Sequence, residues 1–592
     1  MRRKQGGGEP GLMPARPRSQ PLTTISYMKT ILPSLALLSL ASLSPAQDTL
    51  TLYQPTTGTD AYLVDRAGAI VHTWPGTSTP GLSVYLLPDG DLMRTLDIDV
   101  GPVGGGGGLE RVAYDGTVEW SFQFITPTLT PHHDIEVLPN GNVLMIVWEN
   151  IGPAAAIALG RDPANVGNNF RPDAIYEIQP VGAKDGTVVW EWHAQDHVIQ
   201  DFDPQLPGFG VVADHPELID INKGGNADWL HINGIDYNPQ LDQIALSVPF
   251  FDEIWIIDHS TTTAEAASHS GGNSGKGGDI LYRWGNPAAY DRGTAADQEL
   301  FFNHDVTWIE EGRPGAGNLL VYNNGTARPT GNWSSVDEIT PPVDAQGNYS
   351  LAPGGTYGPT SLTWTYSDPS IFYSAIMSGA ERLENGNTLV CESTAGRLFE
   401  VDSAGTVVWD YTNPFGQFSN WVFKGQGYAD CDGDSLVDAQ EIGHLGGDGD
   451  GNGELDACQD PENYCTALAN SSGSPASMGW GGSTSLAAND LALTASSCPP
   501  NVFGLFAFAE NQASTPLGDG VLCLAAPISR LPVVTTDAAG TAIFAFDNQN
   551  LPPTAPPLRA GTTWNFSFWF RDVPGGPAGF NLADGLSVIF SD

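Results

Sequence analysis

A strand pattern that recurs six times between Tyr62 and Trp409 constrains this chain more than any other feature. Each copy reads apolar-x-(Val/Ile)-Asp, then a gap, then Gly-x-(Val/Ile)-x-x-Trp. The copies span 62–74, 109–120, 175–190, 254–284, 336–364 and 399–409. Between them lie strand-turn-strand segments, several with the Asp-Gly or Asn-Gly turns that indicate β-hairpins. A single four-stranded sheet cannot cover both of its faces, so the repeat predicts units arranged around an axis.

The number of half-units indicates how the ring closes. Six outer halves but only five inner halves are present, which fits a ring whose last unit is completed by strands from both ends of the chain. The apolar segment from Asn420 to Phe423 is the expected closing strand. We therefore predict an all-β chain in which residues 48–428 form a six-bladed β-propeller.

The charge balance narrows the class of partner. The chain has 24 basic and 68 acidic residues, for a formal charge of -44. Nucleic acids and anionic membranes are bound through clustered Lys and Arg, so we expect neither as a partner. An acidic surface of this kind is typical of soluble, extracellular proteins.

Residues 28–46 have the three parts of a secretory signal peptide. A basic start precedes an apolar stretch from Ile31 to Leu43, and small residues follow up to Ala46. The stretch is shorter than the about twenty residues of a membrane-spanning helix, so an N-terminal anchor is the weaker alternative. We expect export to the periplasm, the cell surface or the medium, without membrane insertion. Residues 1–27 are interpreted as an extension from a start codon assigned too early.

Residues 429–462 have the ligand spacing of calcium-binding loops. Ca²⁺ prefers six to eight oxygen ligands, and alternating acidic residues wrap such ligands around one ion. The segment resembles the calcium repeats of thrombospondin type 3 and dockerin modules, which implies a structural Ca²⁺; a solvated acidic linker is the alternative. The predicted ligands are Asp430, Asp432, Asp434, Leu436 through its carbonyl, Asp438, Glu441, Asp448, Asp450, Asn452, Glu454 and Asp456.

The last segment, 463–592, has a different residue pattern from the segments before it. Aromatic residues at every second position, as in Trp564 to Phe570, predict a β-sandwich. This domain could attach the protein to glycans or to a cell surface, or only stabilise it. Five of the six cysteines lie after residue 428. A bond between Cys431 and Cys458 would close the acidic segment, but cysteine pairing cannot be read from sequence.

Three histidine motifs occupy matching places in the repeat. They are Pro131-His132-His133-Asp134, Trp229-Leu230-His231-Ile232-Asn233 and Phe302-Asn303-His304-Asp305. Alignment on the turn residues places His133, Asn233 and His304 in one register. The innermost strand of each blade lines the central channel, so these side chains are expected to converge, with His231 and Asn233 on one face of their strand. Imidazole and amide donors without a carboxylate cage favour an anion over a metal ion.

The order of HHD with LPNGNVL, WLHINGIDYN, FFNHD, ERLENGNTLV and GRLFEVDSAGTVVWDYTNP resembles the bacterial arylsulfate sulfotransferase family over residues 60 to about 425. The resemblance implies a six-bladed propeller that transfers a sulfuryl group from a small aryl sulfate to a phenol, without a nucleotide cofactor. It implies His304 as the nucleophile, which becomes sulfated, and His231 and Asn233 as ligands of the sulfate oxygens. His133 or its neighbour His132 would face them.

One place departs from the family pattern. The hairpin after the second motif usually carries an arginine that neutralises the sulfate, but here it reads Ser247-Val248-Pro249-Phe250-Phe251. Arg328 is the candidate replacement. Loss of such a charge-assisted contact costs on the order of a few kcal/mol, enough to change the substrate or abolish activity.

Other functions remain open at this point. A propeller can also be a non-catalytic module that binds a ligand or a protein at the cell surface, because the fold does not determine the function. Release of the sulfate into water would instead indicate a hydrolase. A weaker alternative is a metal ion held by His133, His231 and His304, which predicts stoichiometric zinc or copper.

Overall fold

The computed structural model describes residues 48–98, 105–225, 227–416, 419–431, 435–442, 455, 461–486, 488–553, 555–559 and 562–590. The predicted extension at 1–27 and the signal peptide at 28–46 lie outside these residues. So do the predicted calcium ligands Asp432, Asp434, Asp448, Asp450, Asn452, Glu454 and Asp456. No helix among the described residues is long and apolar enough to cross a membrane.

Six four-stranded antiparallel sheets make up the described part of the chain between Asp48 and Asp430. The first has the order β26-β1-β2-β3, with β26 Val422–Asp430, β1 Asp48–Pro55, β2 Ala61–Val64 and β3 Ile70–Trp74. The second contains β4 Pro80–Leu86, β5 Leu92–Asp97, β6 Gly107–Val112 and β7 Val118–Gln123. The third contains β8 Leu129–Val137, β9 Val143–Glu149, β10 Asp173–Val181 and β11 Asp185–His193.

The remaining three sheets follow the same strand order along the chain. The fourth contains β14 Gly234–Asn238, β15 Gln243–Val248, β16 Glu253–Asp258 and β17 Tyr282–Trp284. The fifth contains β18 His304–Trp308, β19 Leu319–Asn323, β20 Ser335–Ile339 and β21 Trp364–Ser367. The sixth contains β22 Gly379–Arg382, β23 Thr388–Glu392, β24 Arg397–Val401 and β25 Val407–Thr412.

Short elements lie in the connections between these sheets. A long excursion after β11 contains the two-stranded parallel pair β12 Val198–Ile199 and β13 Ile219–Asp220. The helices are α1 Gly152–Ala158, α2 Thr263–Ala266 and α3 Asp438–Gln440, with the 3-10 turns η1 Pro163–Asn165, η2 Ala194–His197, η3 Val212–Asp214, η4 Pro287–Tyr290 and η5 Ser393–Ala395.

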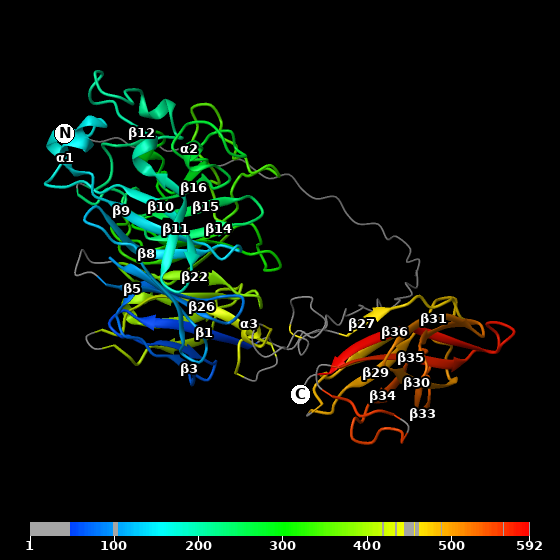
Figure 1. Ribbon diagram of the computed structural model, residues 1–592. Helices are drawn as coiled ribbons and strands as arrows, with labels where there is room; N and C mark the ends of the chain where they lie inside the picture. The colour runs from blue at the N-terminus through cyan, green and yellow to red at the C-terminus, as the bar shows by residue number, and fades with distance from the viewer. Residues whose placement is uncertain are drawn as a thin grey trace, which may run out of the picture. The chain divides into compact units, whose positions relative to one another are not determined.

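The first strands of the sheets contact one another in a cycle. The neighbours are β4 with β8, β8 with β14, β14 with β18, β18 with β22, β22 with β26, and β26 with β4. The predicted closing segment begins β26, which pairs with β1 from the other end of the chain (Figure 1). The arrangement is therefore all-β and propeller-like, as the repeat predicts.

The tryptophan that ends each outer half connects one sheet to the next. Its indole Nε1 donates, at 2.9–3.1 Å in five of the six units, to an oxygen that lies between the last two strands of the following sheet or at the start of the last one. The bonds run from Trp120 to Asp185, Trp190 to Thr261, Trp284 to Pro359, Trp364 to Ser403 and Trp409 to Arg66. The last of these joins the sixth sheet to the first. The recurrence of Trp is therefore explained by contacts between sheets.

The segment that follows β26 packs on the second sheet. Val437 is buried in an apolar cluster with Leu86 and Leu92, and a side chain at Gly90 would contact the backbone of Gln440. Two of the predicted calcium ligands accept backbone hydrogen bonds here: Asp430 Oδ2 from Ser435, and Asp438 Oδ1 from Cys431. Cys431 is disulfide-bonded.

The C-terminal part consists of sheets over one apolar core. A five-stranded sheet has β27 Glu462–Tyr464, β36 Phe580–Phe590, β35 Thr562–Arg571, β30 Phe503–Ala509 and β33 Ser529–Thr535 in this order. A three-stranded sheet contains β28 Ser477–Gly481, β29 Ala492–Ser496 and β34 Ala542–Ala545, and a hairpin contains β31 Gln512–Leu517 and β32 Gly520–Leu524. Both larger sheets contribute to the core, including Leu493, Phe506 and Phe566.

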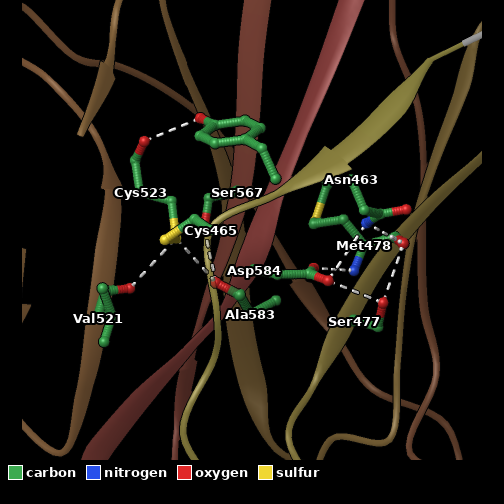
Figure 2. Close-up of a disulfide and its surroundings, with 10 residues drawn as sticks. Asn463, Cys465, Ser477, Met478, Val521, Cys523, Ser567, Ala583 and Asp584 are labelled. Atoms are coloured by element: carbon green, nitrogen blue, oxygen red, sulfur yellow. Dashed lines mark hydrogen bonds between the residues drawn. A yellow bond between two sulfur atoms is a disulfide. The ribbon is translucent and has the colours of Figure 1, made fainter. Parts of the chain in front are cut away.

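A disulfide and a carboxylate hold the edge of this part. Cys465 is bonded to Cys523, which joins the end of β27 to β32 (Figure 2). Asp584 of β36 accepts hydrogen bonds from the backbone of Met478 and the hydroxyl of Ser477 in β28 (Figure 2). Cys391 and Cys498 are buried free thiols.

Candidate active site

The backbone pairing is irregular at two of the three histidine motifs, and this irregularity sets the direction of their side chains. The pairing of β8 shifts register between Pro131 and Ile135, and that of β18 shifts between His304 and Val306. His133 has a φ of 58° within the first irregularity, in the left-handed region. Bulges of this kind redirect side chains and are common beside active sites.

The second motif precedes its strand instead of lying in it. β14 begins at Gly234, and His231 has a φ of 59°. The alternation of an extended strand therefore does not relate His231 to Asn233, and the expectation that they share one face of a strand is wrong. Asn233 is buried, and its Nδ2 donates to the carbonyl of Asn303 at 3.1 Å. Its Oδ1 has no hydrogen-bond partner.

The four histidines come together in one cluster. The ring centroids of His133 and His231 are 4.6 Å apart, and Nδ1 of His132 lies 2.8 Å from Nδ1 of His133. Burial, together with His231, His132 and His304, lowers the pKa of His133 well below its usual range. The structure thus brings together His132 and His133 from β8, His304 from β18 and His231 from the connection before β14.

The environment of His304 determines its tautomer. Nδ1 lies 2.8 Å from Oδ1 of Asn324. The Nδ2 group of Asn324 donates to the carbonyls of Ser374 and Met377 at 2.8 and 2.9 Å, so Oδ1 is the acceptor. Nδ1 of His304 therefore carries the proton, and Nε2 has the lone pair. Burial and His231 lower the pKa of His304 to about 3, which keeps the ring neutral near pH 7.

His231 forms a dyad with a carboxylate. Its Nδ1 lies 2.6 Å from Oδ2 of Asp228, and its ring stacks on Phe250 with centroids 5.0 Å apart. A carboxylate only accepts, so Nδ1 is the donor and Nε2 is left to exchange a proton. Neither Asp228 nor Asn324 was predicted from sequence, because both lie in connections outside the repeat.

His132 is held by an aromatic stack. Its ring lies parallel to Trp148 with centroids 3.8 Å apart, and burial lowers its pKa well below the usual range. Nε2 lies 3.0 Å from a carboxylate oxygen of Asp173 but is not hydrogen-bonded to it.

An arginine other than the predicted Arg328 lies beside this cluster. Arg171 lies over the Trp148 ring at 4.9 Å, and its charge contributes to the lowered pKa of His132. Arg328 instead donates to Ser335 Oγ at 2.8 Å and lies 4.0 Å over the Trp333 ring. Arg171 is in a connection before β10, where the repeat gives no signal for it.

An aromatic cavity of about 550 Å³ adjoins the histidines. Phe250 and Phe302 line it with Phe301, and their own rings are 6.0 Å apart. Phe250 stacks on His231, and Phe302 lies 5.7 Å from His304. Asp252, also in the lining, accepts a hydrogen bond from the Phe302 backbone at 2.7 Å, which fixes that ring at the cavity wall.

A buried ion pair supports the site from the closing strand. Lys424 Nζ lies 2.8 Å from Asp134 and 3.3 Å from Asp305, the acidic residues of the first and third motifs. Burial alone would lower the pKa of Lys424, but the two carboxylates raise it above its usual value. A side chain at Gly379 would collide with Asp305, so only glycine permits this approach.

His133, His231 and His304 do not form a metal-ligand group. Among the described residues, the group of three or more His, Cys, Asp or Glu ligands close enough for one ion is His197, His269 and Asp279. The idea of a metal ion held by the three channel histidines therefore lacks geometric support.

A model of the arylsulfotransferase (ASST) family matches residues 42–412. This chain belongs to that family. The match confirms the resemblance drawn from the motifs and supports an arylsulfotransferase-like function for the ASST chain. A comparison with curated proteins found no match.

Several solved structures are distantly similar to this ASST chain. A protein of unknown function from Bacteroides caccae is 12% identical with a TM-score of 0.36, over 64% of this chain and 98% of that one. Hydrazine synthase from Kuenenia stuttgartiensis is 14% identical with a TM-score of 0.30, over 51% and 70%. The β-propeller domain of Cps50 (Swd1) from Myceliophteria thermophila is 12% identical with a TM-score of 0.30, over 62% and 90%. None of these is close enough to bear on function.

Proposed function

We propose that this protein transfers a sulfuryl group from an aryl sulfate to a phenol through a sulfated His304. The observation that carries the proposal is the fixed tautomer of His304. Its Nδ1 donates to Asn324, which leaves a neutral Nε2 lone pair in a buried cluster beside an aromatic cavity. A neutral imidazole nitrogen is a competent nucleophile, and a covalent intermediate divides one difficult transfer into two easier steps.

In the first step, Nε2 of His304 attacks the sulfur of the aryl sulfate and the bond from sulfur to the aryl oxygen breaks. The leaving oxygen takes a proton from the His231 imidazolium, so a neutral phenol departs. In the second step, the acceptor phenol returns a proton to His231 as its oxygen attacks the sulfur, and the bond from Nε2 to sulfur breaks. The Asp228 carboxylate stabilises the protonated His231 ring before the first step and after the second.

The surroundings favour both parts of the substrate. Phe250, Phe301 and Phe302 form an apolar surface that suits an aryl ring. The sulfate needs positive charge and donors, which Arg171 and His133 would supply from the side of Trp148. The sulfate roles of Asn233 and His132 belong to the same proposal. Arg328 donates to Ser335 and lies over the ring of Phe301, so it contacts one of the rings that line the cavity.

The proposal also covers the domain organisation of the chain. The cycle of first strands supports a closed six-bladed propeller over 48–428, with the histidines at its hub. We also propose export through the signal at 28–46, a structural Ca²⁺ in 429–462 and a separate domain at 463–592. Asp430 and Asp438 each keep one carboxylate oxygen on a backbone donor, which suits ligands of a tight loop.

The test is the release of a chromophore from 4-nitrophenyl sulfate, with and without added phenol. Transfer predicts release that depends on the acceptor and is lost in His304→Ala. His215→Ala is the matched control, because that histidine is exposed and paired with Glu217 outside the cluster. Mass spectrometry of the protein mixed with donor alone should find one sulfuryl group on His304.

Two results would contradict the proposal. Release at the same rate without an acceptor would indicate a hydrolase. No release and no sulfated histidine over a panel of aryl sulfates would indicate a binding module instead of an enzyme.

A further inference from the structure

A second cluster of histidines lies apart from the proposed site. It joins η2, which follows β11, to the connection between β16 and β17. His197 Nδ1 lies 2.9 Å and His269 Nδ1 2.7 Å from Oδ1 of Asp279. His197 is fully buried and Asp279 nearly so, whereas 62% of the His269 side chain is exposed.

The hydrogen bonding of His197 leaves a lone pair directed at a carboxylate. Nε2 of His197 lies 2.8 Å from the carbonyl oxygen of Ala266, which can only accept, so Nε2 carries the proton. In the neutral ring Nδ1 then has a lone pair that faces Asp279 Oδ1. Two electron-rich atoms at this distance repel each other unless a cation or a second proton lies between them.

The position of His197 is rigid. Trp192 stacks on its ring with an interplanar angle of 3°, and the indole donates to the carbonyl of Gly278 at 2.7 Å. A side chain at Gly278 would lie 2.5 Å from Nε2 of His197, so only glycine lets the loop approach the ring. A metal-binding histidine whose other nitrogen donates to a backbone carbonyl is held in this way.

We propose that His197, His269 and Asp279 bind a divalent transition metal ion such as Zn²⁺. Two imidazole nitrogens and one carboxylate oxygen are the ligands that zinc prefers, and the exposed side of His269 leaves room for a water molecule as the fourth. The ligand atoms all lie within 4.8 Å of one another. Tetrahedral zinc separates its ligands by about 3.3 Å. The exposed His269 would move outward from Asp279, and a turn of the Asp279 carboxylate would lengthen its 2.9 Å distance to Nδ1 of His197.

Such an ion would tie the long β16–β17 connection to η2. The two segments are already joined through His197 and Ala266 of α2, and the ion would add a bond to His269, ten residues before Asp279 in sequence. The role of the ion is then to stabilise the β16–β17 connection, which lies outside the strands of the repeat.

The test measures zinc binding to the full chain after removal of metal with a chelator. Excess Ca²⁺ is present throughout, so that the acidic segment is occupied. The wild type should bind one more equivalent of Zn²⁺ than His269→Ala, and its melting temperature should rise on zinc addition while that of the variant does not. His215→Ala should bind as the wild type, because this exposed histidine has a single acidic partner.

Co²⁺ gives a second readout that does not depend on stability. The wild type should develop the visible absorption of a tetrahedral cobalt site, and His269→Ala should not. Since His269 is exposed, this variant is expected to keep its fold, which circular dichroism checks. Equal zinc content and equal cobalt spectra for the two proteins would overturn the proposal and leave a proton between His197 and Asp279.

Discussion

His304 and Asn324 share a hydrogen bond of 2.8 Å in which only one position of the proton is possible. The amide nitrogen of Asn324 is used by two backbone carbonyls, so its oxygen must accept from Nδ1. The nitrogen of His304 that has the lone pair is therefore determined by a residue twenty positions later in the chain, beyond β19.

Replacing Asn324 with Ala should impair catalysis more than binding. Without the acceptor, His304 is free to adopt the tautomer that has its proton on Nε2, and a buried N–H loses its partner. We expect kcat to fall on the order of 10- to 100-fold, from a hydrogen bond of about 1–3 kcal/mol, with little change in KM. Steady-state kinetics with 4-nitrophenyl sulfate and phenol measure both constants.

The matched control is Asn387→Ala, which removes an amide from the β22–β23 turn, far along the sequence from His304. It should leave kcat unchanged. A loss of secondary structure in Asn324→Ala by circular dichroism, in proportion to its fall in kcat, would show a folding defect instead of a tautomer effect.

The low pKa of His304 predicts how stability and activity depend on pH. The folded pKa is about 3, below the value near 6.5 of an unfolded histidine. Between these values the unfolded chain binds a proton that the folded chain does not. The free energy of unfolding should therefore fall as the pH drops below about 6.5, and should not depend on His304 above it.

Denaturation by urea at pH 7 and pH 5 measures this effect. His304→Gln should lose less stability between the two pH values than the wild type, because the unfolded variant has no imidazole at this position to take up a proton. The same slope in both proteins would contradict the prediction. In a plot of enzymatic rate against pH, protonation of His304 should cause no fall in the rate near pH 6.5.

The repeat and its turns were enough to predict most of the fold. The outer halves 62–74, 109–120 and 399–409 became the strand pairs β2–β3, β6–β7 and β24–β25, because alternation and Trp recur in each. His133 and His304 could be placed by the same register. These are local patterns, which a sequence carries directly.

The residues that complete the site could not be predicted in this way. Asn324, Asp228 and Arg171 lie in connections whose path depends on how neighbouring sheets pack together. The expected alternation of His231 and Asn233 failed because His231 has left-handed backbone before the strand begins. Arg328 was predicted from its place after the third motif, and the structure holds it on Ser335, Trp333 and the cavity residue Phe301.

Arg171 and Arg328 should differ in their effect on catalysis. If Arg171 supplies the charge that the hairpin at Pro249 lacks, Arg171→Gln should lower kcat/KM on the order of 10- to 100-fold, as expected for a hydrogen bond to a charged group of about 1.5–3 kcal/mol. Arg328→Gln should change stability but leave kcat/KM within about twofold of the wild type. Equal losses of kcat/KM in the two variants would show that neither arginine has a specific role toward the sulfate.

Lys424 should be essential for stability. Lys424→Met would leave the carboxylates of Asp134 and Asp305 buried without their cation. Removing one partner of such a buried pair typically costs about 3–5 kcal/mol in the free energy of unfolding. Urea denaturation at pH 7 measures the loss.

A second set of variants separates charge from packing. Adding Asp134→Asn and Asp305→Asn to Lys424→Met removes the uncompensated charges, so the triple variant should be more stable than the single one. A triple variant that is less stable than Lys424→Met would mean that the loss comes from packing of the lysine stem and not from its charge.

The aromatic cavity should determine affinity for the aryl group. Phe250→Ala removes a ring that faces the cavity and stacks on His231, so both apolar contact and the orientation of His231 are weakened. We expect kcat/KM for 4-nitrophenyl sulfate to fall roughly 5- to 150-fold, which corresponds to a rise of about 1–3 kcal/mol in the activation free energy. Phe503→Ala is the control, since this phenylalanine is 65% exposed in the C-terminal part. Phe250→Leu keeps an apolar side chain at this part of the wall and should recover part of the loss. An equal defect in the Leu and Ala variants would indicate that the stack on His231, not the cavity surface, accounts for the effect.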